Sequence, residues 1–211
     1  MTGSTLNMHY TIADPKTFGI SEYEPVLPIY HSGQPEDSKE HCSDLLHRLD
    51  RIDPDRLSPE NAYTYRLLHR SLENNLALAD FPYYNEPLSP SSGMQSQLPV
   101  LLAEYTFRTK RDVTDYLALL DQIDDYFASL LLYEQEKAAA GFFMPACSSE
   151  KVRKQCDTIV TTEELTQGTH FLQTTFEDRL SELQKQGLFT PEETASLIET
   201  NDRLLATVVQ P

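Results

Sequence analysis

The stretch that decides the fold is SGMQSQLPVLLAEYTFRTKRDVTDYL, residues 92–117. It passes from a Gly/Ser/Gln cluster through an apolar run into a basic cluster and then a periodic pattern. A half-buried strand would alternate apolar and polar side chains, and this run does not alternate. Its apolar residues recur at helical spacing: Leu98, Leu101, Leu102 and Tyr105. Pro99 is tolerated in a first helical turn, so the run favours a short buried helix, with a strand as the alternative.

The longest helical pattern follows directly, over residues 112–140. One apolar stripe runs along it: Val113, Tyr116, Leu117, Leu120, Ile123, Phe127, Leu130 and Leu131. Asp112 and Asp115 fall in the first turn, where negative charge suits the helix dipole. Gly141 is a good terminator, so the pattern predicts one helix over residues 112–140.

Similar spacing predicts five further helices, over residues 37–52, 58–80, 149–160, 165–185 and 191–208. Residues suited to cap them precede three of these helices: Ser58 with Pro59, Ser148 or Ser149, and Thr190 with Glu193. No repeat of 20–50 residues is visible, which disfavours a solenoid. The predicted fold is all-α, an irregular multi-helix bundle with an extended N-terminal arm.

The arm covers residues 1–36 and precedes a helical domain over residues 37–211. Four prolines disfavour helix in it, yet it is rich in apolar and aromatic residues, so we expect it to lie against the rest of the protein. Prolines, serines and a glycine make residues 82–97 the clearest loop. The apolar arm and the periodic last residues together predict that the chain is the N-terminal portion of a longer protein.

The charge of the chain bounds its partners. The 211 residues carry a net charge of -16, which repels phosphate backbones and argues against nucleic-acid binding. No apolar stretch reaches the length of a membrane span, and the first residues lack the features of a secretion signal. The 3 cysteines show no disulfide or zinc-binding spacing.

A search for catalytic motifs finds none. The sequence contains no zinc-protease HExxH, no phosphate-binding glycine loop and no GxSxG nucleophile motif, so no catalytic residue or metal ligand is assigned in this chain. His41, Asp44 and His47 recur every three residues and could in principle hold a metal. A solvated helix face explains the same residues and is the favoured interpretation.

The basic cluster Arg108, Lys110 and Arg111 is the most suggestive feature. It stands just before a helix, where positive charge opposes the dipole, and such a local cost can mark a site that holds a carboxylate. Tyr105 offers a flat apolar face and a hydroxyl to a peptide. Tyr105, Arg108 and Arg111 are therefore the candidate substrate-binding residues. Ion pairs with neighbouring acids and simple gap filling are the structural alternatives.

Three phrases carry a resemblance to a known family: LNMHYTIADPKTFGI, SGMQSQLPVLLAEYTFRTKRDVTDYLALLDQIDDYF and EKAAAGFFMP. They resemble the N-terminal part of the bacterial domain-of-unknown-function family 885, in order from about residue 5 to about residue 185. The resemblance implies a longer, largely helical protein similar in fold to gluzincin zinc metallopeptidases. Its zinc motif, of the H-E-x-x-x-G-H kind, would lie in the C-terminal half. No position here matches that motif, so zinc is expected only in a longer parent.

Two functions remain open. In the first, the chain is the N-terminal helical segment of a zinc-metallopeptidase-like protein. It would form part of a substrate cleft, would be inactive alone, and would partner the C-terminal remainder of the same polypeptide. The parent would be a carboxypeptidase-like enzyme acting on peptides, secreted or anchored as a lipoprotein. In the second, the chain is a non-catalytic helical binding or structural module.

Overall fold

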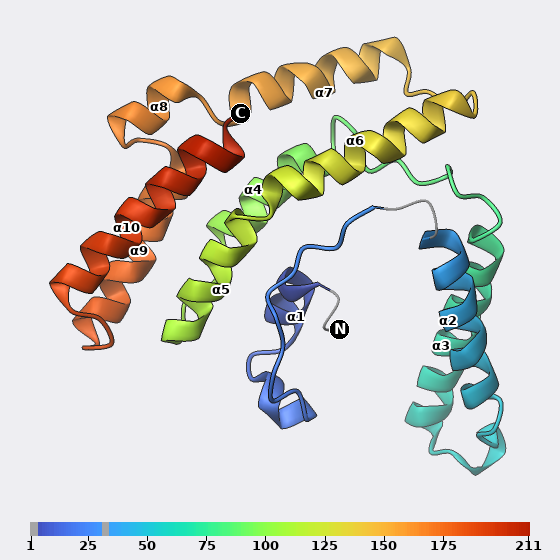
Figure 1. Ribbon diagram of the computed structural model, residues 1–211. Helices are drawn as coiled ribbons and strands as arrows, with labels where there is room; N and C mark the ends of the chain where they lie inside the picture. The colour runs from blue at the N-terminus through green and yellow to red at the C-terminus, as the bar shows by residue number, and fades with distance from the viewer. Residues whose placement is uncertain (1–3, 31–33) are drawn as a thin grey trace. The chain divides into compact units, whose positions relative to one another are not determined.

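The computed structural model describes the backbone of residues 4–30 and 34–211, and the side chains of residues 4–30 and 37–211. Every regular element in these ranges is helical, which confirms the predicted all-α fold (Figure 1). The chain divides into two compact units. The larger comprises residues 1–29, 87–131 and 143–211, and the smaller comprises residues 30–86 and 132–142. The predicted boundary between residues 36 and 37 stays a prediction.

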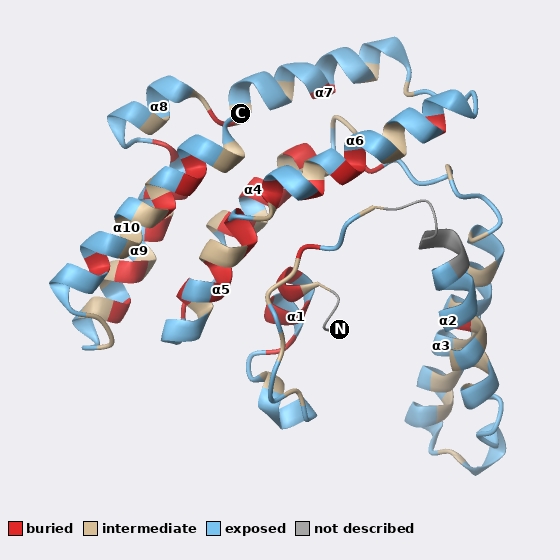
Figure 2. Cartoon of the chain, in the orientation of Figure 1, coloured by how far each residue is buried: buried red, intermediate tan, exposed pale blue. Residues whose placement is uncertain are grey.

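The smaller unit is built on a helical hairpin, α2 (Gln34–Leu49) and α3 (Pro59–Leu78), which confirms the helices predicted there. Ser58 caps α3 by accepting a hydrogen bond from the Asn61 amide at 3.3 Å. No residue of α3 is fully buried (Figure 2). His41, Asp44 and His47 are all exposed on α2. No group of three metal-ligating side chains occurs in the described residues.

An ion pair formed by a buried lysine connects the end of α6 (Ile123–Ala139) to the segment after α3. Nζ of Lys137 lies 2.7 Å from Oε1 of Glu86, and the lysine side chain is only 4% exposed. The Tyr133 hydroxyl donates to the Pro82 and Asn85 carbonyls. These contacts order the first part of the predicted loop 82–97 within the smaller unit.

The core of the larger unit lies on the inner faces of its helices, as the buried stripes in Figure 2 show. These helices are α1 (Thr5–Thr11), α4 (Met94–Ala103), α5 (Lys110–Leu120), the first part of α6, α7 (Ala146–Ile159), α8 (Thr162–Gln167), α9 (Phe171–Lys185) and α10 (Pro191–Leu204). Aromatic rings pack at the centre of the core. The Tyr116 and Phe176 rings lie 5.4 Å apart between centroids.

The apolar run within residues 92–117 forms α4, so the strand alternative is wrong. The helix starts earlier than predicted, after Gly93, and Pro99 therefore lies inside it rather than in its first turn. The buried Gln95 amide supports this early start. Its Nε2 donates to the Ser89 carbonyl at 2.7 Å and to Gln155 Oε1 at 2.9 Å.

The helix predicted over residues 112–140 is two helices, α5 and α6, which separate at Asp121 and Gln122. The Gln122 side chain explains the break, because its amide binds the N-terminal segment as another peptide group would. Its Oε1 accepts from the Leu27 amide at 3.0 Å, and its Nε2 donates to the carbonyls of Pro25 at 3.0 Å and Ala118 at 2.8 Å.

Three other boundaries correct the sequence predictions. The helix expected over 165–185 splits into α8 and α9 at Gly168, whose φ of 68° is left-handed. Helix α7 begins after Pro145 without a side-chain cap, so Ser148 and Ser149 lie inside it. Helix α10 keeps its predicted capping box of Thr190 and Glu193 and then widens into a π-helical turn, η3 (Leu205–Val209).

The N-terminal arm is only partly extended, because α1 and the 3-10 turn η1 (Pro15–Phe18) occupy its first half. The Thr5 hydroxyl accepts from the Val26 amide at 2.8 Å, which folds the extended part back along α1. Four apolar side chains of the arm are buried, as expected of a segment that packs against the protein: Leu6, Met8, Ile12 and Leu27. Residues 1–3 and 31–33 lie outside the described residues.

Candidate functional site

A hollow of about 540 Å³ lies between the N-terminal segment and the start of α5, within the larger unit. Its lining joins two parts of the sequence: Ala13, Asp14, Pro15, Lys16, Ile20, Ser21, Tyr23, Arg108, Thr109, Arg111 and Asp112. Two of the three candidate residues, Arg108 and Arg111, thus face the same hollow. We call it the carboxylate hollow.

Arg108 is one of the two arginines that line this hollow. Its backbone amide donates to Asp112 Oδ2 at 2.8 Å, while its Nη1 lies 3.4 Å from His9 Nε2. No carboxylate lies within ion-pair distance of this guanidinium among the residues with described side chains. Arg108 is therefore a cation that lines the hollow and forms no ion pair with the carboxylates described there, although Asp14 and Asp112 also line it.

Arg111 is held more tightly. Its Nε lies 3.4 Å from Asp115 Oδ2, and its guanidinium carbon lies 3.9 Å from the centre of the Tyr23 ring. The Tyr23 hydroxyl donates to the same carboxylate oxygen at 2.7 Å. Burial and this hydrogen bond raise the pKa of Tyr23 to about 12. The ion-pair alternative thus describes Arg111 and not Arg108.

Tyr105 does not line the hollow. Its side chain is fully buried, and its ring stacks on His9 with 3.7 Å between centroids. Burial raises the pKa of Tyr105 far above its usual value. Its hydroxyl has no hydrogen-bond partner among the described residues. Tyr105 therefore supports the site from within the core.

His9 is a site residue that the sequence did not reveal. Its ring lies on Tyr105, with Nδ1 3.8 Å from Asp112 Oδ1 and Nε2 facing Arg108. Burial lowers the pKa of His9, and the nearby Arg108 adds to this lowering, although Asp112 opposes it. A neutral imidazole with a free Nε2 can accept a hydrogen bond from Arg108. The only signal was its place in the family-like phrase LNMHYTIADPKTFGI.

Asp112 fixes the frame of the site. Its Oδ2 accepts hydrogen bonds from the backbone amides of Arg108 at 2.8 Å and Thr109 at 2.7 Å, while the Thr109 hydroxyl caps α5. This capping box satisfies amides that the helix start would leave unpaired. It also sets Arg108 and Arg111 on either side of one rigid turn.

The remaining charges of the hollow come from the N-terminal segment. Asp14 caps η1 by accepting from the Lys16 amide at 3.1 Å, and both side chains line the hollow. With Arg108 and Arg111, the Lys16 ammonium gathers positive charge in a chain whose net charge is -16. Arginine presents a planar fork that matches a carboxylate. Arg108, Arg111 and Lys16 are therefore the side chains of this hollow whose chemistry suits a carboxylate.

Comparison with known proteins gives the family. Residues 16–211 match the family described as "Bacterial protein of unknown function (DUF885)". The chain belongs to the DUF885 family. No curated protein sequence matches this DUF885 chain.

A solved structure shares the fold. It is titled "The crystal structure of the putative lipoprotein from Colwellia psychrerythraea" and aligns with the DUF885 chain at a TM-score of 0.74 and 16% sequence identity. The alignment covers 98% of the DUF885 chain and 36% of the other, so this chain spans about a third of that protein's length. Among the described helices, none is both long and apolar enough to span a bilayer.

The described residues do not fit the zinc that the family resemblance implies. A catalytic zinc site needs about three protein ligands, and no suitable group of His, Cys, Asp or Glu occurs in the ranges that the structure describes.

Proposed function

We propose that this chain contributes a carboxylate-binding wall to the substrate cleft of a longer, peptidase-like DUF885 protein. The observation that carries the proposal is the guanidinium of Arg108, which faces the hollow without a carboxylate partner in the described part of the chain. A charge-assisted pair with a ligand carboxylate would complete it.

A peptide C-terminus is the carboxylate that this hollow suits best. The Tyr23 ring gives an apolar wall beside Arg111, and Arg108 and Lys16 offer hydrogen-bond donors. A carboxypeptidase-like enzyme must hold the free C-terminus of its substrate. Under this proposal the zinc and the catalytic residues belong to the remainder of the longer polypeptide, so this chain alone is inactive.

The structural relative supports a proposal about location. It is described as a "putative lipoprotein", and its chain is much longer than this one. We extend this to the parent of the present chain, which would be secreted or lipid-anchored. The peptides it acts on would then lie outside the cytoplasm.

A non-catalytic binding module is the second candidate function, favoured by one observation. The carboxylate hollow is formed entirely within this chain, so it can bind a ligand without any further domain. If the longer polypeptide hydrolyses the bound peptide, the peptidase-like function is supported. If it binds the peptide without hydrolysing it, the binding module is supported.

The experiment measures binding of an N-acetylated dipeptide with a free C-terminus by NMR titration, against the same dipeptide with an amidated C-terminus. We expect the amide to bind at least tenfold more weakly. Arg108→Gln should remove this preference, and Arg108→Lys should keep part of it. Arg153→Gln, on the exposed face of α7, is the matched control and should bind like the unmodified chain.

Equal binding of the two dipeptides would contradict the proposal. In the longer polypeptide, Arg108→Ala should lose activity on peptides with a free C-terminus. It should keep its melting temperature, because the Arg108 guanidinium forms no ion pair among the residues with described side chains. A fall in melting temperature with normal residual specific activity would show that Arg108 is structural.

A further inference from the structure

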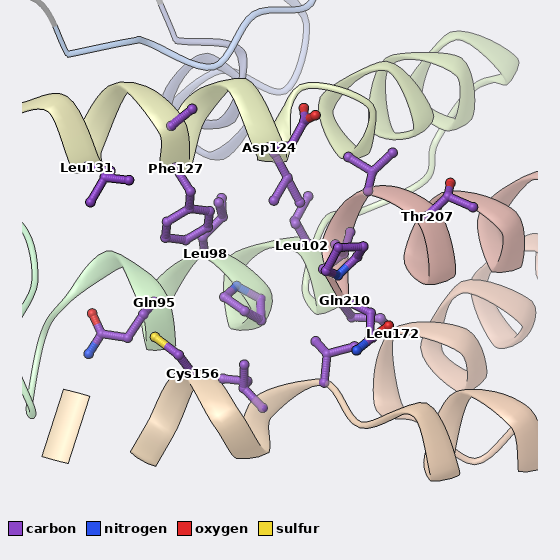
Figure 3. A pocket seen from close by; sticks show the side chains of 18 residues that line it. Gln95, Leu98, Leu102, Asp124, Phe127, Leu131, Cys156, Leu172, Thr207 and Gln210 are labelled. Carbon is purple, nitrogen blue, oxygen red and sulfur yellow. The ribbon is translucent and has the colours of Figure 1, made fainter. Parts of the chain in front are cut away.

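A second hollow of about 480 Å³ lies elsewhere in the larger unit, and we call it the apolar groove (Figure 3). Its walls come from α4, α6, α7, α9 and the last residues of the chain. Phe127 and Leu131 project from α6 toward the side of the groove where Cys156 of α7 and Leu172 of α9 lie (Figure 3). None of these residues belongs to the carboxylate hollow.

The walls of this groove are mostly apolar, and part of the apolar lining is open to solvent. Leu131 is 58% exposed although it lines the groove, and the lining residues Val208 and Val209 are half-buried. Apolar side chains gathered in one exposed concavity usually mark a contact surface. The groove therefore has the apolar composition of a surface that another polypeptide segment covers.

The π-helical turn η3 shapes one wall. It widens the last turn after α10, and its consecutive residues Thr207, Val208 and Val209 all line the groove. In a regular α-helix, successive side chains point about 100° apart around the axis. Three consecutive side chains would then face one hollow less readily. Wide turns of this kind occur often at functional positions.

The charge of the groove is one-sided. Among its lining side chains only that of Asp124 carries a formal charge, and Figure 3 shows it directed away from Leu172, at the edge. No lysine or arginine lines the groove. Within a chain of net charge -16, an occupant with basic residues beside its apolar face is favoured.

We propose that the apolar groove receives an amphipathic helix with basic flanks, supplied by the additional polypeptide that longer DUF885 proteins carry. The solved relative has most of its length outside the matched region, because the match covers 36% of it. A helix that lays apolar side chains into such a groove is a recurrent mode of recognition. The inference stands on the groove alone and does not depend on the carboxylate hollow.

Charge decides against a second copy of this chain as the occupant. Two chains of net charge -16 repel one another, and the edge carboxylate of each groove would meet another acidic surface. A fatty acid is disfavoured as the occupant, because the Asp124 carboxylate at the edge would repel the carboxylate head group of the fatty acid. The basic amphipathic helix satisfies both the apolar walls and the charge.

The test uses an 18-residue helical peptide as a stand-in for that helix. It has leucine at helical spacing, lysine elsewhere, blocked ends and a fluorescent label, and its binding to the 211-residue chain is followed by fluorescence anisotropy. We expect Leu131→Glu to weaken binding at least tenfold. Leu132→Glu is the matched control, because Leu132 is adjacent and 61% exposed but does not line the groove. It should change binding less than twofold.

Two further measurements keep the proposal falsifiable if Leu131→Glu disturbs folding. Asp124→Asn should weaken peptide binding about threefold in low salt and leave it unchanged in high salt. Bound peptide should slow maleimide labelling of Cys156, which lines the groove, but not of Cys147, which is exposed on the same helix outside it.

Three results would overturn the proposal. The first is equal peptide binding by all variants with equal labelling of both thiols, which shows only attraction between opposite net charges. The second is saturable binding of a fluorescent fatty acid in the groove without peptide binding. The third is self-association of the chain that Leu131→Glu abolishes. Because the blocked peptide has no carboxylate, its binding tests the apolar groove separately from the carboxylate hollow.

Discussion

The guanidinium of Arg108 lies 3.4 Å from the imidazole of His9, although 99 residues separate them in the sequence. This contact joins the N-terminal segment to the start of α5 at the edge of the carboxylate hollow. The stability of the fold therefore depends on whether His9 is protonated.

The first prediction concerns pH. Because burial lowers the folded-state pKa of His9 below 6.5, protons bind the unfolded chain more readily than the folded one. The stability that neutral His9 allows is complete above its unfolded pKa and falls as the pH drops from about 6.5 toward the lowered folded value. Urea unfolding between pH 7.5 and pH 5 should show this loss. His9→Gln should flatten that pH dependence, and His41→Gln, at an exposed position, should not.

The second prediction concerns Gly93. A Cβ at this position would lie 2.2 Å from the Ser89 amide nitrogen and 2.6 Å from its carbonyl oxygen, and backbone atoms cannot move aside cheaply. Its φ of -72° suits any residue, so the effect of Gly93→Ala is steric alone. We expect a loss of about 2–3 kcal/mol in the free energy of unfolding.

Gly141→Ala is the comparison for Gly93. Space is open around Gly141, and only its left-handed φ of 88° opposes a side chain, so its loss should be nearer 1 kcal/mol. Equal losses in urea unfolding would show that the close approach at Gly93 is not the cause.

The helices could be predicted from the sequence because helical periodicity and caps are local properties. The split at Gly168 could have been predicted too, since glycine commonly ends a helix in the left-handed conformation. The break at Gln122 could not, because its cause is a set of bonds to Pro25 and Leu27 that are distant in sequence. Tyr105 is buried beneath His9 and so does not line the hollow. This could not be predicted either, because His9 is distant from Tyr105 in the sequence.

The third prediction concerns Asn201. Its side chain is fully buried, and neither its amide nitrogen nor its oxygen has a partner among the described residues. An unpaired buried amide costs about 1–3 kcal/mol, so Asn201→Leu, which nearly keeps the shape, should raise the free energy of unfolding by about 1 kcal/mol.

Gln173→Leu tests the converse of that change on the facing helix α9. The Gln173 Nε2 donates to Asp202 Oδ1 at 3.0 Å, and its removal should lower stability. Chemical denaturation of both variants is the measurement. A loss of stability in Asn201→Leu would mean that its amide is satisfied by ordered water.

The fourth prediction concerns Gln122. Gln122→Ala removes two hydrogen bonds that hold residues 25–27 and a third to the Ala118 carbonyl, each with a net worth of about 1 kcal/mol. Hydrogen exchange at the Leu27 amide should become much faster. Gln122→Glu keeps an acceptor for that amide but loses both donors, so its effect should be intermediate. Unchanged exchange in both variants would contradict the assigned role.

The hydrogen bonds that join Gln122 to Pro25 and Leu27 have a consequence for synthesis on the ribosome. Its partner amide at Leu27 emerges 95 residues earlier. At elongation rates of about 5–20 residues per second, the apolar N-terminal segment waits roughly 5–19 s for its binding site. The helical hairpin of α2 and α3 forms from neighbouring residues and is complete before then. The nascent chain therefore exposes side chains that are buried in the folded protein, such as Met8 and Leu27, until α5 has been translated. A chaperone that binds apolar segments would act during this interval.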